Sequence, residues 1–486
     1  MPEHGYSQDL SDLPPRLLID GQWRDAADNR RIAVENPATG REIAQVADAA
    51  TPDGLSALDA ACRAQAHWAG QPPRYRADLL HRACDRLLAE RDRFARVISL
   101  ETGKPPGEAR AEVDYAAGFL RWFAEEALRI HGREQPAPGG GMRQIISRWP
   151  VGPCLLITPW NFPLAMITRK VGPALAAGCA MVLKPAEQTP LTAILFCRLM
   201  QEIGLPPGVL NLITTTRAES VVGTLLSDGR LRKVSFTGST RVGRLILAGA
   251  AATILRSSME LGGNNPFILF DDADLDRAVD SAVQAKLRNL GQACTAANRF
   301  LVQDGIAAAF TSRLTERFAA LPPDSLGPMI DTAARHNLHG LVQETVARGA
   351  TLVLGGEIPA GPGYHYPPTI LTQIPPDAPI LHREIFGPVA PIQTFATEAD
   401  AVTMANDSDY GLAAYACTRD LDRVMRLQAG LQTGMLGINT GIISDPAAPF
   451  GGIKQSGLGR EGGVEGIDEY LTTRYTAIAA PPAPSH

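Results

Sequence analysis

The chain has 486 residues, of which 45% are hydrophobic and 20% charged, and its 46 basic side chains are slightly outnumbered by 51 acidic ones, for a net charge of -5. This length exceeds what one hydrophobic core usually supports, so two or three domains are expected. The mildly acidic balance gives no electrostatic reason to expect a nucleic-acid partner, and the longest nearly apolar run, from Val171, is far shorter than a membrane span.

Two segments with alternating polarity predict isolated strands. Residues 131–150 hold a Pro/Gly-rich turn followed by an alternating pattern, and YLTTRYTAI alternates near the end of the chain. Strands this isolated are unstable alone, so each is expected to pair with something. Spacing leaves two possibilities open: a hairpin on the chain's own domain, or pairing with a neighbouring subunit.

From Val151 onward, short apolar runs such as VGPCLLIT and KVSFTG alternate with helical patterns, and the series ends at Gly262. A second series runs from NPFILFDD to GMLGINT. Alternation of this kind predicts right-handed crossovers and parallel sheets covered on both faces. The predicted fold class is therefore α/β, with two doubly wound, Rossmann-like domains. We expect a nucleotide-binding domain at residues 1–130 and 151–262, and a second domain at residues 263–465.

Cys294 is the candidate nucleophile. It lies in GQACTAANR, after a helix that Gly291 is expected to end, and its small polar neighbours leave the sulfur reachable. Most free cysteines are inert and buried, as Cys154 and Cys179 inside apolar runs are expected to be. Seven cysteines without a CxxC pair, and a polar N-terminus without a secretory pattern, favour a reducing cytoplasm over a disulfide framework or a zinc site.

Glu260 and Asn161 are candidates to assist such a nucleophile. Glu260, in MELGGNNP, ends the last strand of the first series, where open α/β sheets form ligand clefts, and could act as a general base. Its alternative is a solvated charge at a strand end. Asn161, in the stiff loop TPWNFP, could donate to an oxyanion, or could merely bond its own turn.

Two glycine-rich segments compete for a phosphate-binding role. GLGREG, from Gly457 to Gly462, matches GxGxxG, but it follows no predicted strand and opens no βαβ unit, so it is interpreted as a loop. FTGSTRVG lies where a strand meets the helix that starts at Ser239. Backbone N–H groups at such a helix N-terminus can hold a phosphate, so this segment is favoured.

In order and spacing, TPWNFP, KPAEQTP, FTGSTRVG, MELGGNNP, GQACTAANR, REIFGP and PFGGIKQSGLGRE resemble the aldehyde dehydrogenase superfamily over almost the whole chain. The resemblance implies that Cys294 attacks an aldehyde carbon, that the Asn161 amide and the Cys294 N–H stabilise the oxyanion, and that Glu260 activates water to hydrolyse a thioester. It also implies a β arm, residues 131–150 and 466–486, that pairs across subunits in homodimers or homotetramers.

The same resemblance implies a nicotinamide dinucleotide cofactor and no metal. The residues that would bind the cofactor are Lys184 and Glu187 at the adenine ribose, Gly238 and Ser239 at the pyrophosphate, Glu384 at the nicotinamide ribose, and Trp160 and Leu261 along the cleft. A carboxylate at Glu187 accepts bonds from ribose hydroxyls and repels a 2'-phosphate, which predicts NAD in preference to NADP. The positive charge of Arg241 could nevertheless tolerate NADP.

MITRK, KLRNLGQ and GINTGIIS are similar to segments of succinate-semialdehyde dehydrogenases within that superfamily. By this resemblance, Arg169, Arg288 and Ser444 grip the distal carboxylate of the substrate. Two guanidinium groups that converge on an aldehyde pocket are also costly unless an anion pairs with them, although for either arginine alone a structural salt bridge would be the commoner explanation.

The expected reaction is oxidation of succinate semialdehyde to succinate. Glutarate semialdehyde or another carboxylate-bearing semialdehyde is the alternative, because one methylene changes binding by only about 1–3 kcal/mol. A non-catalytic binding or structural protein on the same fold is a remote alternative. A cysteine hydrolase would need a histidine base, and none of the nine histidines lies in a motif.

Two positions depart from the family pattern. Ala296 stands where many of these enzymes carry a second cysteine, so no regulatory disulfide with Cys294 is expected, whereas direct oxidation of the thiol remains open. Asn265 stands where relatives often have Ala or Ser. The sequence offers no physical interpretation of this asparagine.

Overall fold

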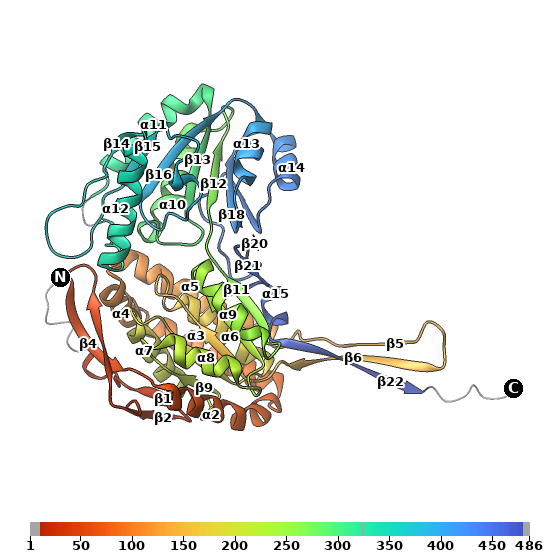
Figure 1. Ribbon diagram of the computed structural model, residues 1–486. Coiled ribbons are helices and arrows are strands. Elements are labelled where there is room, and N and C mark those ends of the chain that lie inside the picture. Colours follow the sequence, from red (N-terminus) through yellow and green to blue (C-terminus); the bar gives the residue numbers. More distant parts are fainter. Residues whose placement is uncertain (1–9, 323–324, 480–486) are drawn as a thin grey trace.

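The computed structural model describes residues 10–322 and 325–479, which form two α/β parts and a narrow arm (Figure 1). The first part contains the N-terminal half of the chain and the second part most of the C-terminal half. The arm projects from the first part, away from both sheets. No helix in the described ranges is long and apolar enough to cross a membrane.

An eight-stranded sheet forms the centre of the first part as far as the structure describes it. Its strands, in spatial order, are β2 (Gln22–Arg24), β1 (Leu17–Ile19), β9 (Leu210–Leu212), β8 (Met181–Lys184), β7 (Cys154–Ile157), β10 (Lys233–Thr237), β11 (Arg256–Glu260) and β21 (Gly457–Leu458). The strands from β9 to β11 are parallel. Because chain order reverses between β7 and β10, the loops after these two strands diverge and leave the crevice where such sheets bind ligands.

Helices cover both faces of this sheet, because successive strand residues point to opposite sides. Leu156 and Leu183 belong to the core cluster under one helical layer, and Leu155 and Val182 to the cluster under the other. The first layer contains α3 (Pro73–Ala89), α4 (Arg91–Thr102), α5 (Pro106–Glu126), α6 (Ala165–Ala177) and α7 (Pro190–Glu202). The second contains α2 (Thr51–Ala69), α8 (Ala218–Ser227) and α9 (Thr240–Ala251).

The second part is built on a seven-stranded sheet within the described residues. Its order is β14 (Thr351–Leu354), β15 (Thr369–Thr372), β16 (Val389–Phe395), β13 (Ala297–Gln303), β12 (Asn265–Leu269), β18 (Ala413–Cys417) and β19 (Met435–Ile438), and only β14 is antiparallel to its neighbour. One face packs on α10 (Leu275–Leu287) and α11 (Asp304–Ala319), the other on α13 (Glu398–Asn406) and α14 (Leu421–Gly430). The α/β fold class is thus confirmed, with two sheets covered on both faces.

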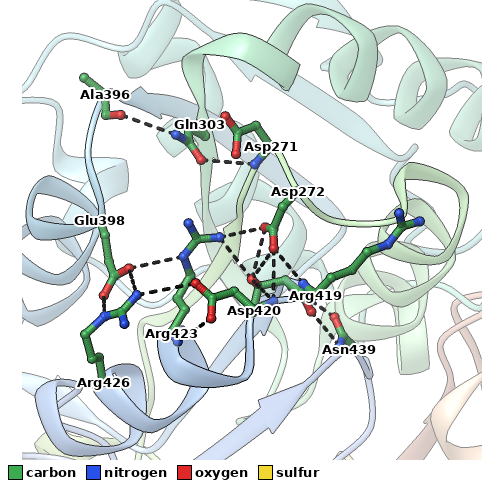
Figure 2. A network of polar contacts seen from close by, with 11 residues as sticks. Asp271, Asp272, Gln303, Ala396, Glu398, Arg419, Asp420, Arg423, Arg426 and Asn439 are labelled. Carbon is green, nitrogen blue, oxygen red and sulfur yellow. Dashed lines mark hydrogen bonds and ion pairs between the residues drawn. The ribbon is translucent and has the colours of Figure 1, made fainter.

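Polar contacts join the loops at the carboxyl edge of the second sheet (Figure 2). Asp272, just after β12, accepts hydrogen bonds from the Thr418 hydroxyl, the Arg423 guanidinium and the backbone N–H groups of Arg419 and Asp420. Glu398 pairs with both Arg423 and Arg426. Cys294 precedes β13 and therefore lies at the opposite, amino edge, which faces the first part.

The arm is a three-stranded antiparallel sheet of β5 (Arg133–Pro136), β6 (Met142–Pro150) and β22 (Leu471–Ala479). All nine residues of β22 pair with β6, so the two segments that lacked a partner in the sequence pair with each other within one chain. Most of their side chains are exposed, including the large apolar groups of Trp149, Tyr475 and Ile478.

Apart from α12, the remaining elements are short. They are β3 (Arg31–Asn36), β4 (Arg41–Ala47), η2 (Arg288–Gly291), α12 (Thr332–Ala347), η4 (Pro379–Leu381), β17 (Tyr410–Gly411), β20 (Ile453–Lys454) and α15 (Glu465–Asp468). The ends of the chain included in the predicted ranges, residues 1–9 and 480–486, lie outside the described residues.

Two local expectations are wrong. The segment Gly457–Gly462 is more than a loop, because its first two residues form β21 and pair with Met259 and Glu260 of β11. The helix before Cys294 ends at Leu287 and not at Gly291. Residues Arg288–Gly291 form a separate 3-10 turn, in which Asn289 and Leu290 have φ values of 52° and 55°, so Arg288 caps the helix instead of lying in its last turn.

Candidate active site

The three sequence-predicted catalytic residues meet where the two sheets face each other. Asn161, after β7, donates from Nδ2 to the carbonyl of Gln292 at 3.0 Å, two residues before Cys294. Glu260, at the end of β11, leads into Gly263, and a Cβ on that glycine would lie 2.8 Å from the Cys294 carbonyl oxygen. The carboxyl end of the first sheet and the amino end of the second therefore build one site.

Cys294 is partly exposed, as a nucleophile must be. Burial of the sulfur raises the pKa of its thiol to about 12, and the acidic groups of Glu260 and Glu384 act in the same direction. The positive charges of Arg169 and Arg288 oppose this rise. The protein alone thus holds Cys294 as a thiol at neutral pH, and its proton must leave before or during attack.

Glu260 is a buried carboxyl, 3% exposed, whose two oxygens have no hydrogen-bond partner within residues 10–322 and 325–479. Burial, followed by the charge of Glu461, raises its pKa well above the ordinary value, while Arg169, Lys170 and Arg460 lower it. The alternative interpretation, a solvated charge at the strand end, is therefore wrong. An unpaired buried carboxyl is costly and can accept a proton from a water molecule or a substrate.

Lys170 and Glu461 form a buried ion pair beside Glu260, which sequence reasoning missed. Lys170 Nζ lies 2.5 Å from Glu461 Oε1 and 2.8 Å from the Ser235 hydroxyl. Both members influence the pKa of Glu260. The signal was available, because Lys170 follows Thr168 and Arg169 in a helix whose other residues are apolar or small and which is buried along its whole length.

The Asn161 loop is held by hydrogen bonds with α5, with the turn before it and with Asn289. The Asn161 carbonyl accepts from Lys104 Nζ at 2.9 Å and from Asn289 Nδ2 at 3.0 Å. Lys104 also pairs with buried Glu112, whose other oxygen accepts from the N–H groups of Leu164 and Ala165 at the start of α6. Because its bonds reach Gln292 and Lys104, Asn161 is more than a turn residue that bonds its own backbone.

The crevice between β7 and β10 fits a dinucleotide. Ser239 caps α9 by accepting from the Val242 N–H, so the N-terminus of this helix points into the crevice. At Gly238 a Cβ would lie 2.4 Å from the Phe236 ring, so only glycine fits. Leu261 packs on the same helix, because a Cβ at Gly243 would lie 2.5 Å from its side chain.

Three other predicted cofactor residues lie at the carboxyl edge of the same sheet, Trp160 after β7, Lys184 at the end of β8 and Glu187 in the loop that follows it. Lys184 ends β8 and lies 3.4 Å from the carboxylate of Glu187, whose side chain is 45% exposed. Half-buried Trp160 packs edge to face on Phe386 of the second part, with ring centroids 5.4 Å apart. Arg241 is exposed on the first turn of α9. The lysine and carboxylate at the end of β8 fit an adenosine ribose, and the capped helix fits the pyrophosphate.

Glu384 approaches from the second part. Its Oε1 accepts from the Gly263 N–H at 3.1 Å, and burial raises its pKa to about 7 against the effects of that bond and of Lys286. Lys286 is fully buried, and burial lowers its pKa to about 7. Sequence reasoning missed Lys286, although it continues the buried stripe of Ala278 and Ala282 on α10 at helical spacing.

Arg169 and Arg288 come together on an aromatic pair of α5. The Arg169 guanidinium lies 5.4 Å from the Phe119 ring and 3.8 Å from Phe450, and the Arg288 guanidinium lies 5.9 Å from the Tyr115 ring. Arg288 also lies 4.8 Å from the Phe162 ring, next to Asn161. The positive charges of both arginines lower the pKa of the Cys294 thiol.

Arg169 does not lack a carboxylate partner, contrary to the expectation that both guanidinium groups await an anion. Its Nε lies 3.5 Å from Glu461 Oε2. Arg288 is half-buried, its guanidinium lies against aromatic faces, and it forms no ion pair within residues 10–322 and 325–479, although its charge also acts on Glu108. It therefore remains the better candidate to bind an arriving anion. Ser444, half-buried in the loop after β19, follows Ile443, which packs near Cys294 in a small apolar cluster.

The described residues hold no group of three or more His, Cys, Asp or Glu that could bind a metal ion. Each of the seven cysteines lies in the described part, where all are free thiols. The site is thus defined by one accessible sulfur, one buried carboxyl, one amide, two guanidinium groups and a helix N-terminus.

Residues 23–476 match the model of the aldehyde dehydrogenase family. Among curated proteins, a succinate-semialdehyde dehydrogenase of Paenarthrobacter nicotinovorans is 55% identical over 90% of this chain and 99% of its own, and a glutarate-semialdehyde dehydrogenase of Pseudomonas aeruginosa is 46% identical over 95% and 97%. Among solved structures, an NADP-dependent enzyme of E. coli matches with a TM-score of 0.94 and 44% identity, over 96% of this chain and 98% of that one.

Proposed function

Since the chain belongs to the aldehyde dehydrogenase family, we propose that it oxidises a semialdehyde bearing a distal carboxylate, in the first place succinate semialdehyde, to the dicarboxylic acid with NAD or NADP. The observation that supports a carboxylate on the substrate is the pair of guanidinium groups of Arg169 and Arg288. Both lie against aromatic rings of α5, and both lower the pKa of the Cys294 thiol. The 55% identity to a succinate-semialdehyde dehydrogenase supports the four-carbon substrate.

In this proposal the Cys294 sulfur bonds to the aldehyde carbon, and the carbonyl oxygen becomes an oxyanion. The thiol proton passes to solvent water as the C–S bond forms, and the Asn161 amide and the Cys294 N–H donate to the oxyanion. A bound nicotinamide dinucleotide supplies the hydride acceptor. Once hydride has left the former aldehyde carbon, a thioester joins that carbon to Cys294, and Glu260 takes the proton of the water that attacks it. The acid leaves and the thiol is restored.

The cofactor would lie in the crevice between β7 and β10. Gly238 and Ser239 would hold the pyrophosphate at the N-terminus of α9, Lys184 and Glu187 the adenine ribose, and Glu384 the nicotinamide ribose, with Trp160 and Leu261 along the walls. We propose a preference for NAD, because the Glu187 carboxylate repels a 2'-phosphate. The similarity to an NADP-dependent enzyme makes NADP the alternative.

Arg288, Arg169 and Ser444 would bind the distal carboxylate. Arg288 supplies a charge that forms no ion pair in the described part of the chain, whereas Arg169, paired with Glu461, supplies a donor that is already oriented. Glutarate semialdehyde is the second candidate, supported by the 46% identity to a glutarate-semialdehyde dehydrogenase. A non-catalytic role is disfavoured, because a structural protein needs neither an accessible sulfur nor an unpaired buried carboxyl.

We assign residues 1–130 and 151–262 to a cofactor-binding domain, residues 263–465 to a catalytic domain, and residues 131–150 and 466–486 to an oligomerisation arm. The arm displays exposed Trp149, Tyr475 and Ile478 on strands too slender to cover them, which favours a homodimer or homotetramer. Free thiols throughout fit a reducing cytoplasm.

A rate panel tests the proposal. The enzyme is assayed with succinate semialdehyde, glutarate semialdehyde and an uncharged aldehyde of similar length, each with NAD and with NADP. The expected result is the highest kcat/KM for a carboxylate-bearing substrate. Equal efficiency with the uncharged aldehyde would refute the carboxylate clamp while leaving the enzyme class intact.

A further inference from the structure

Asn265, the first residue of β12, links the loop that carries Cys294 to the neighbouring strand β18 through its side-chain amide. Its Nδ2 donates to the carbonyl oxygens of Cys294, at 2.7 Å, and Ala296, at 2.9 Å. Its Oδ1 accepts from the Ala413 N–H of β18 at 3.0 Å. Because two carbonyls can only accept and a backbone N–H can only donate, these partners fix the orientation of the amide. The side chain is 1% exposed, so it contacts neither solvent nor surface.

The carbonyl groups of residues 294–297 all accept hydrogen bonds from buried side chains. Asn265 binds those of Cys294 and Ala296, the Tyr415 hydroxyl binds that of Thr295 at 2.7 Å, and Lys286 Nζ binds that of Ala297 at 2.9 Å. The donors come from three elements of the second part, β12, β18 and α10. Of these three donors, Asn265 is the one bonded to the Cys294 peptide itself.

We propose that Asn265 is a positioning residue for the nucleophile, which sets the orientation of the Cys294–Thr295 peptide and thereby the direction of the Cys294 sulfur. It touches no reacting atom. The inference rests on the proposed role of Cys294 as nucleophile. Because the peptide unit is planar, fixing its carbonyl fixes the plane that leaves Cα of Cys294, and the bond from Asn161 to the Gln292 carbonyl fixes the chain on the other side.

Such anchoring affects rate more than binding. The sulfur must stand about 3–3.5 Å from the aldehyde carbon along the direction of attack, and a displacement of about 1 Å can reduce the rate about 100-fold. The loop itself supplies little rigidity, because it follows Asn289 and Leu290 in the left-handed region and lies outside regular structure until β13 begins at Ala297. The bonds from Asn265 replace the support that a strand or helix would give.

The matched control is Asn211, in β9 of the other sheet. It is also fully buried in a strand, donates from Nδ2 to two carbonyls, those of Met181 and Gly208, and accepts a backbone N–H, that of Asp20, on Oδ1. Asn211→Ala therefore removes the same number and kind of buried hydrogen bonds as Asn265→Ala, but in the other sheet, away from Cys294. The two variants should lose thermal stability to a similar extent.

The measurement is the first-turnover formation of reduced cofactor at saturating semialdehyde and cofactor, followed by stopped flow. Its amplitude counts active sites, and its rate constant reports the chemistry at each site. For Asn265→Ala the rate constant should fall at least about 10-fold, with an unchanged KM for the cofactor. An aldehyde deuterated at C1 should show a changed isotope effect. Asn211→Ala should keep the wild-type rate constant, even if its amplitude is reduced.

Two milder variants keep the test decisive if Asn265→Ala does not fold. Asn265→Ser retains a single donor and should fall between wild type and alanine. Tyr415→Phe removes only the hydroxyl that binds the Thr295 carbonyl and should lower the same rate constant by a smaller factor. Wild-type rate constants in both, or an Asn265→Ala variant that differs from wild type only in amplitude and melting temperature, would overturn the positioning role.

Cys294→Ser in the same assay separates this inference from the proposed function. If it abolishes the burst while Asn265→Ala keeps the wild-type rate constant, only the positioning role is wrong. If Cys294→Ser keeps full activity, the assignment of the nucleophile fails, and the role of Asn265 fails with it.

Discussion

Tyr115 and Phe119 stand one turn apart on α5 and meet edge to face with ring centroids 4.9 Å apart, and each lies against one of the two guanidinium groups beside Cys294. A helix of the first part thus sets the spacing between Arg169, on α6, and Arg288, which follows α10 of the second part. The proposed substrate clamp therefore depends on the contact between the two parts.

Arg288→Gln should reduce kcat/KM for succinate semialdehyde about 10- to 100-fold, because a hydrogen-bonded ion pair with the distal carboxylate is lost. The value for an uncharged aldehyde of similar length should stay within about twofold. Initial-rate kinetics with both substrates check this. The control is Arg313→Gln, which removes a surface ion pair with Asp276 in the same part of the molecule. Equal losses for both substrates would mean that Arg288 supports the fold and not the carboxylate.

Glu461→Gln should shift the acid limb of the kcat–pH profile to lower pH. Hydrolysis needs Glu260 as a carboxylate, so kcat rises as pH rises through its elevated pKa. Burial and then the Glu461 charge raise that pKa, while Arg169 and Lys170 lower it, so removing the Glu461 charge lowers it. Profiles from pH 5 to 10 measure the shift.

Glu469→Gln is the control for that profile, since Glu469 lies 3.5 Å from another buried lysine, Lys233, at the amino end of β10, whereas Glu260 lies at the carboxyl end of β11. Its acid limb should coincide with that of the wild type. A shift to higher pH in Glu461→Gln, or the same shift in both variants, would contradict the role of Glu260 as the base.

Glu187→Ser should change cofactor choice. The wild type should prefer NAD, and the variant should gain efficiency with NADP by about tenfold or more, because a carboxylate beside the 2'-phosphate is removed. The ratio of kcat/KM values for the two cofactors is the measurement. Glu219→Ser, at an exposed carboxylate in the first turn of α8, should leave the ratio unchanged. A wild type that already favours NADP would refute the argument from Glu187.

Glu101→Gln should make stability less dependent on pH. Burial raises the pKa of Glu101 to about 8 in the folded state, so the folded protein holds a proton that the unfolded chain releases near pH 4.5. The stability that this extra proton gives the folded state is fully present below pH 4.5 and is lost as pH rises to about 8. Over that range the free energy of unfolding falls by up to about 1.4 kcal/mol per pH unit. Urea unfolding between pH 5 and 9 measures the difference between wild type and variant. Parallel curves would contradict the elevated pKa.

Both large sheets could be predicted from the sequence, because buried parallel strands appear as short apolar runs such as CLLI of β7 and FIL of β12, separated by helical patterns. The register of the arm could not. Its strands β6 and β22 lie more than 320 positions apart and expose most of their side chains, so no apolar stripe specifies how they align.

At the site, the sequence indicated the groups that are proposed to carry chemistry but not the residues that bind and orient them. Cys294, Glu260 and Asn161 follow strands or helix ends, where local patterns are informative. Asn265 and Lys286 donate hydrogen bonds to carbonyl groups of the Cys294 loop. They come close to this loop only when β12, β13 and α10 pack together, so local sequence patterns do not reveal the contact. The partner of Arg169, Glu461, lies 292 positions away, next to a short strand that was interpreted as a loop.

The most direct test of a thioester on Cys294 uses Glu260→Gln, in which acylation can proceed but water is not activated. The variant is mixed with succinate semialdehyde and cofactor, quenched in acid, and its mass measured before and after proteolysis. The expected result is one succinyl group per active site on the peptide that contains Cys294, with a stoichiometric first burst of reduced cofactor and steady turnover lowered about 100- to 10,000-fold. Reduced cofactor formed in the burst without any acyl group on Cys294 would contradict the mechanism.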